Sequence, residues 1–133
     1  MPEADIAITT AEPSASCPSA IEVGRRIGEI LSGFATLSPG SAELDRAIDL
    51  LVGAEDVLAA LPAGSDAGAA AKALAAVDML DQAGVPCDAA AERAFSAARG
   101  ALLTAIARLL ERGPLDLAAL GRRHLAGALA AAA

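Results

Sequence analysis

The chain is poor in the side chains with which proteins usually carry out catalysis or hold cofactors. Its 133 residues include one histidine, two cysteines and two phenylalanines, but neither tryptophan nor tyrosine. A zinc site needs several Cys or His ligands in a characteristic spacing, and a di-iron bundle needs Glu-x-x-His pairs, which this sequence lacks. We therefore expect neither a metal ion nor any other cofactor.

Motifs that bind phosphate groups or activate a nucleophile are also missing. No glycine-rich segment ends in Gly-Lys-Ser or Gly-Lys-Thr, and the glycines in residues 24–33 lie inside a helical pattern with no strand before it. A catalytic Ser-His-Asp or Cys-His group would have to use His124, which shares a helical face with leucines. We expect a partly packed histidine there and a protein without enzymatic activity.

Signals for export or for membrane insertion are absent from the sequence. No window of 18 apolar residues is free of charge, so we expect no membrane-spanning helix. The first residues contain neither a basic segment nor an apolar run, so Cys17 and Cys87 are not expected to form a structural disulfide. We expect a soluble cytoplasmic protein.

Alanine is the most abundant residue, with 37 occurrences. It favours helix and allows helices to approach closely, while leucine, isoleucine and valine must supply most of the buried apolar surface. Each of these larger side chains contributes about 1.5–3 kcal/mol when fully buried. This composition predicts an all-α protein with small residues at the helix contacts.

Residues 88–112 form the longest uninterrupted helical pattern. Asp88 is a suitable N-cap, because its carboxylate can accept hydrogen bonds from free N–H groups of the first turn. Gly113 and Pro114 provide the stop, since proline cannot continue a helix. The apolar stripe comprises Ala91, Phe95, Ala98, Leu102, Ala105, Ile106 and Leu109.

Four further helices are predicted by apolar periodicity and capping residues. Residues 20–35 follow Ser19, which has capping-box spacing to Glu22, and residues 42–61 follow Ser41. Residues 67–83 follow Ser65 or Asp66. A short fifth helix through about Leu129 is expected, with Asp116 as its cap. The stripe predicted for residues 42–61 comprises Leu44, Ile48, Leu51, Val52 and Leu58.

The short turns between these helices favour antiparallel neighbours. We predict an up-down antiparallel four-helix bundle with a short C-terminal fifth helix and a flexible N-terminal arm. Residues 1–18 would be the tail and residues 19–133 the bundle domain. Gly24 and Gly28 lie together on one flank of the first helix, where they indicate either close approach of another backbone or merely a weak helix.

Charge is unevenly distributed along the chain. Residues 1–92 carry 15 acidic and four basic side chains, whereas residues 93–133 carry six arginines and two acidic side chains. The arginines are expected to pair with acidic neighbours within the fold, although a basic patch for an acidic partner is the alternative. Because the net charge is −7, nucleic-acid binding is not expected.

Two charged residues interrupt apolar helical surfaces. Glu55 lies between Leu51 and Leu58, and Arg99 lies beside Leu103 and Leu110. A buried carboxylate must be paired or protonated, so the two side chains either neutralise each other, or Glu55 reaches solvent, or they form a polar spot for a ligand or partner. The residues predicted as possible ligand or partner contacts are Glu55, Arg99, Arg93, Arg108 and Arg112, of which the last three share the opposite helix face.

Apolar helical faces are plentiful in this sequence, whereas catalytic residue types are scarce. Several large apolar residues fall outside a single narrow stripe and need the fifth helix, a second copy or a partner to cover them. These residues are Leu50, Val57, Leu103, Leu110, Leu125 and Leu129. We predict a non-enzymatic protein–protein interaction module, such as a small adaptor, chaperone-like protein or accessory subunit, which binds another protein or a second copy of itself.

Two other functions are compatible with the sequence. The first is a small-molecule-binding protein or enzyme subunit with a cavity near Glu55 and Arg99. The second is a DNA-binding regulator, in which the last two helices imitate a helix-turn-helix with Arg122 and Arg123 on the second helix.

Overall fold

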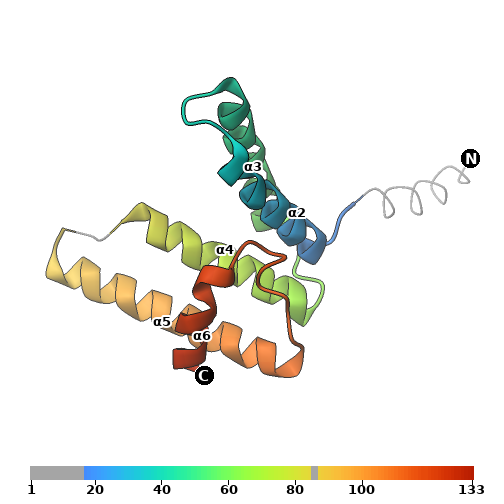
Figure 1. Ribbon diagram of the computed structural model, residues 1–133. Coiled ribbons are helices and arrows are strands. Elements are labelled where there is room, and N and C mark those ends of the chain that lie inside the picture. The colour runs from blue at the N-terminus through green and yellow to red at the C-terminus, as the bar shows by residue number, and fades with distance from the viewer. Residues whose placement is uncertain (1–16, 85–86) are drawn as a thin grey trace, which may run out of the picture.

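The structure, a computed structural model, describes residues 17–84 and 87–133. These residues are helical throughout apart from turns and loops, which confirms the predicted all-α class (Figure 1). Residues 1–16 of the predicted N-terminal arm lie outside the described residues. The helices are α2 (Ala20–Gly33), α3 (Ala42–Ala60), α4 (Asp66–Ala83), α5 (Ala89–Arg112) and α6 (Ala126–Ala132), with short 3-10 turns at Phe34–Thr36 and Arg123–Leu125.

Capping side chains set the starts of the four longer helices, as the sequence predicts. Ser19 and Glu22 form a capping box, and the hydrogen bond that the Ser19 backbone N–H donates to the Glu22 carboxylate lowers the pKa of Glu22. Ser41 caps α3, Ser65 caps α4 and Asp88 caps α5. Of the two caps considered for α4, the serine is therefore the one used.

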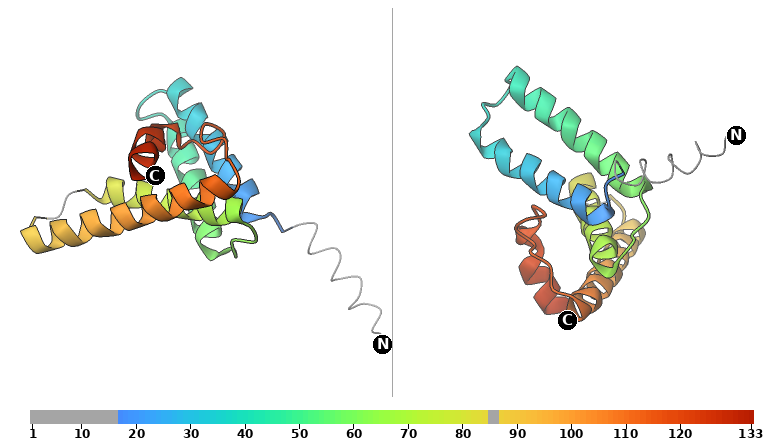
Figure 2. Two further views of the ribbon diagram at one scale, coloured as in Figure 1. Left: turned by 90° about the horizontal axis from the view of Figure 1, so that it is seen from below. Right: turned by 90° about the vertical axis from the view of Figure 1, so that its right-hand side faces the viewer.

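The helices pair into two antiparallel hairpins, one of α2 with α3 and the other of α4 with α5. The hairpins meet mainly where α2 packs on α4, and α3 contacts α4 much less (Figures 1 and 2). The packing is consistent with the predicted bundle. Figure 1 and the right-hand view of Figure 2 show that the free end of the α2–α3 hairpin diverges from the α4–α5 hairpin. Because α3 packs closely only on α2, much of its surface has no described helix against it.

Two apolar clusters make up the core. One lies between α4, α5 and the C-terminal segment and includes Leu74, Val77 and Ile106. The other lies mainly between α2 and α3 and includes Ile27 and Leu58. These five are the largest fully buried side chains, and each contributes about 1.5–3 kcal/mol through burial. None of the helices in the described part of the chain is long and apolar enough to cross a membrane.

The short fifth helix exists, but it begins at Ala126 instead of near residue 116. Asp116 does act as a cap, accepting hydrogen bonds from the N–H groups of Ala118 and Ala119 at 3.1 and 3.4 Å. It caps a turn, because Gly121 takes a φ of 71° that a helix does not allow. The chain then reaches α6 through the 3-10 turn.

The turn at residues 117–121 crosses α2 at Gly24 and Gly28, the two glycines that the sequence analysis identifies. A Cβ atom on Gly28 would lie 2.0 Å from the carbonyl oxygen of Ala119, and one on Gly24 would lie 3.0 Å from Leu120. Such distances leave no room for any side chain at position 28. Close backbone approach is thus the correct interpretation of Gly28, whereas Gly24 lies against the side chains of Leu120 and Ala71. Both contacts hold the C-terminal segment or α4 against α2.

Candidate functional site

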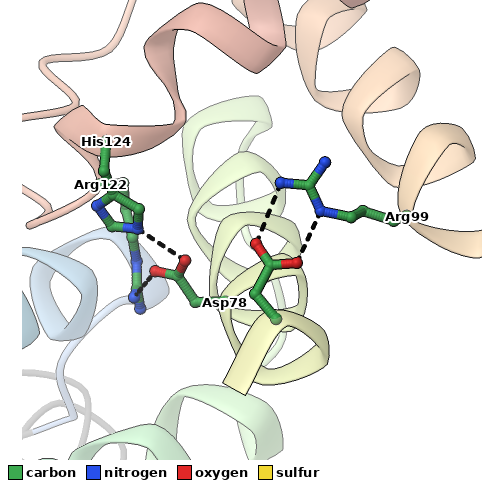
Figure 3. A network of polar contacts seen from close by, with 5 residues as sticks. Asp78, Arg99, Arg122 and His124 are labelled. Carbon is green, nitrogen blue, oxygen red and sulfur yellow. Dashed lines mark hydrogen bonds and ion pairs between the residues drawn. The ribbon is translucent and has the colours of Figure 1, made fainter. Parts of the chain in front are cut away.

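The two charged residues that the sequence predicts as a possible pair lie apart. Arg99 on α5 instead forms a two-point ion pair with Asp81 on α4, with N–O distances of 2.7 and 3.1 Å (Figure 3). The hydrogen bond to Asp81 raises the pKa of Arg99 above its ordinary value. Mutual neutralisation of Glu55 and Arg99 is therefore wrong as an explanation of either residue.

The other arginines predicted as partner contacts lie on exposed parts of α5. Arg108 is 3.4 Å from Glu111 on the same helix, and Arg112 is 3.1 Å from Asp66 at the start of α4. Arg93 is exposed near the opposite end of the helix. Exposed pairs of this kind contribute little stability, about 0–1 kcal/mol. A role of these three arginines in ligand or partner binding stays a prediction.

A buried polar cluster that sequence reasoning missed lies between α4 and the C-terminal segment. The side chain of Asp78 is held from two sides, by the Arg122 guanidinium on one oxygen and by His124 Nε2 at 2.7 Å from the other (Figure 3). Asp78 is 6% exposed and Arg122 is 4% exposed. Asp78 follows the buried Leu74 by four residues and therefore lies on the same inner face of α4. This spacing is the sequence feature from which burial of Asp78 could have been predicted.

The chemistry of this cluster favours a structural role. The carboxylate and the guanidinium neutralise each other in a buried place, where either one alone would be costly. A pocket of about 420 Å³ beside them is lined by Leu31, Asp78, Asp81, Gln82, Gly121, Arg122 and His124. This lining offers no serine or cysteine nucleophile, and the described residues include no group of three potential metal ligands.

The second polar feature is a shallow groove in the angle between α3 and α4. It has a volume of about 220 Å³ and contains Glu55 from α3. The remaining lining residues are Leu58, Ala59, Lys72, Ala75, Ala76 and Met79. Ile48 and Val52 continue the lining face along α3, because residues 48, 52, 55 and 59 recur at helical spacing. We call Ile48, Val52, Glu55, Ala59, Ala76 and Met79 the α3–α4 surface.

The exposure of α3 corrects the stripe predicted for it. Leu58 is buried, whereas Ile48 and Val52 are 42% and 51% exposed. Leu50 and Val57 are also exposed. They lie on a second flank of α3, up to about 160° from Val52 around the helix axis. The prediction failed because α3 carries apolar residues on several sides and only α2 packs closely against it. By contrast, Leu103, Leu125 and Leu129 are buried between α5 and the C-terminal segment.

Lys72, the cation that lines the groove, is hydrogen-bonded to backbone carbonyl oxygens. The Lys72 ammonium donates to the carbonyl oxygen of Ala59 at 3.2 Å and to that of Leu61, so it caps the C-terminal end of α3. Among the residues that the structure describes, no cation lies within ion-pair distance of Glu55. Burial raises the pKa of Glu55, and the more distant Arg122 offsets part of this rise.

Replacement of Glu55 by glutamine should change how stability depends on pH. The folded protein holds the Glu55 proton more tightly than the unfolded chain does, so ionisation of Glu55 disfavours folding at neutral pH and this penalty disappears as the pH falls through the carboxyl pKa. Glu55→Gln should therefore be more stable than the wild type at pH 7, with a difference that shrinks toward pH 4. Urea unfolding across this range measures it, and a constant difference would show that Glu55 is not desolvated.

Comparison of the chain with protein-family models, with curated proteins and with solved structures finds no match to any of them.

Proposed function

We propose that this protein is a non-enzymatic interaction module that binds another polypeptide through the α3–α4 surface. The observation that carries the proposal is the distribution of exposed apolar side chains. Among the residues that the structure describes, five large hydrophobic side chains are 42% to 53% exposed, four on α3 and one on α4: Ile48, Leu50, Val52, Val57 and Met79. Clustered apolar exposure of this kind is typical of interaction sites.

Within this set, the groove side of α3 supports the proposal better than the opposite flank. Ile48 and Val52 adjoin a concave surface that also includes Met79, whereas Leu50 and Val57 face away from α4. A concave apolar surface can bury a partner side chain from two directions. The binding energy of an interface is usually concentrated in such a place.

Affinity purification from the native host tests this proposal with matched variants. Ile48→Ser/Val52→Ser removes two exposed aliphatic side chains from the groove side, and Leu50→Ser/Val57→Ser removes two from the other flank. Because all four are exposed, both variants should fold as the wild type does. We expect the wild type and the Leu50/Val57 variant to recover the same partner and the Ile48/Val52 variant to lose it. Equal recovery by all three proteins would contradict the proposal.

The structure gives less support to the two alternatives. A small-molecule site formed by Glu55 and Arg99 needs one cavity that contains both, and the groove at Glu55 does not include Arg99. A helix-turn-helix needs an exposed recognition helix, but α6 has seven residues and no charged side chain. Arg122, which would contact DNA in that hypothesis, is buried against Asp78.

A further inference from the structure

The shape of the α3–α4 surface suits a helix. The groove lies between α3 and α4 near their connection at residues 61–65, and α3 contributes Glu55, Leu58 and Ala59 to it. Farther from this connection the two helices diverge. Beyond the groove, the same face of α3 continues from Ala59 to the exposed Val52 and Ile48, and these three apolar positions cover about three turns. A partner helix that places one apolar face in such a groove is a common mode of peptide recognition.

The charges around the groove favour a basic occupant. Helix α3 carries five acidic side chains and one arginine. Asp45, Asp49 and Asp56 lie within about 60° of Val52 around the helix axis, on the side away from Glu55, and form an acidic edge along α3. Glu55 lies inside the groove between Val52 and Ala59, and the ammonium of Lys72 is held by carbonyl oxygens at the end of α3. The groove thus presents an apolar face with acidic groups in it and beside it.

We infer that the groove takes an amphipathic helix of a partner protein whose apolar face is flanked by lysine or arginine, with one of these cations meeting Glu55. This inference rests on the proposed function and specifies the partner. A cation at this position would supply the ion pair that Glu55 does not find among the described residues. The acidic edge would align the helix and raise its association rate.

Synthetic helical peptides of about 18 residues, or five turns, can serve as probes. The basic probe has leucine on one face and lysine on the flanks. An acidic twin has glutamate in place of each lysine, and a scrambled basic peptide has the same composition without an apolar face. Fluorescence anisotropy at about 0.15 M salt measures binding to the full chain, since screening at this salt limits non-specific attraction between exposed charges.

We expect the basic probe to bind at least about tenfold more tightly than the acidic twin or the scrambled peptide. Ile48→Ser/Val52→Ser should weaken its binding by about tenfold or more, whereas Leu50→Ser/Val57→Ser should leave it within about twofold. Met79→Ser, which tests the α4 side independently, should also weaken it. Glu55→Gln should weaken the basic probe by about threefold or more and leave the acidic twin unchanged.

Two results would overturn the inference. One is an acidic or scrambled peptide that binds as tightly as the basic probe. The other is equal loss from the two double variants, which would place the probe outside the groove. Either result is compatible with a natural partner that is recovered through Ile48 and Val52, so the proposed function would survive it. Equal recovery of the partner by the wild type and both double variants in the affinity purification, by contrast, would contradict the proposed function itself.

Discussion

Asp78→Ala is expected to lower the free energy of unfolding by about 3–5 kcal/mol, the usual cost of removing one partner from a buried ion pair. The variant leaves the Arg122 guanidinium buried without its carboxylate and also releases His124. Since small domains are stable by about 5–15 kcal/mol, this loss is a large part of the total. Urea unfolding followed by circular dichroism measures it.

Two companion variants separate the charge effect from a general packing defect. Asp81→Ala breaks the more exposed pair with Arg99 and should cost no more than about 1 kcal/mol. Asp78→Leu combined with Arg122→Met removes both buried charges and should recover most of the stability lost in Asp78→Ala, because such pairs are often replaceable by apolar side chains. If Asp78→Ala cost as little as Asp81→Ala, the buried ion pair would not hold the C-terminal segment.

Gly28→Ala is expected to destabilise the fold by about 3 kcal/mol or more, at the upper end of the cost of overpacking. The added methyl group would lie 2.0 Å from the Ala119 carbonyl oxygen, and a backbone atom cannot avoid it by changing rotamer. The turn at residues 117–121 must move away from α2. Thermal unfolding should show a lower midpoint, and amide exchange in this turn should become faster.

Gly100→Ala is the matched control for this substitution. Gly100 also lies inside a helix, but a Cβ atom there would meet nothing within 4 Å. Alanine has the higher helix propensity, so this variant should gain up to about 1 kcal/mol. Equal and small effects of the two substitutions would show that the C-terminal turn does not press against Gly28.

Local features of the sequence predict the helix ends well. A serine or aspartate before each of the four longer helices satisfies backbone N–H groups within its own first turn, so the outcome does not depend on distant residues. The start of the last helix was predicted wrongly for the same local reason. Asp116 caps a turn as readily as a helix, and contacts with α2 and the left-handed Gly121 decide between them.

Tertiary partners are harder to predict, because they depend on residues far apart in the sequence. Asp78 and Arg122 are separated by 44 positions, and Arg99 and Asp81 by 18. Periodicity also cannot say which face of α3 receives a neighbour when several faces are apolar. Ile48 and Val52 belong to a regular stripe, yet the angle between the two hairpins leaves them exposed.

The most direct test of the account is site-specific photo-crosslinking in the native host. A photoreactive amino acid at position 52 lies on the α3–α4 surface, and one at position 50 lies on the opposite flank of the same helix at similar exposure. We expect a covalent adduct with another polypeptide at position 52 and little or none at position 50. No adduct at position 52, or equal adducts at both positions, would contradict the claim that the groove side of α3 binds a partner.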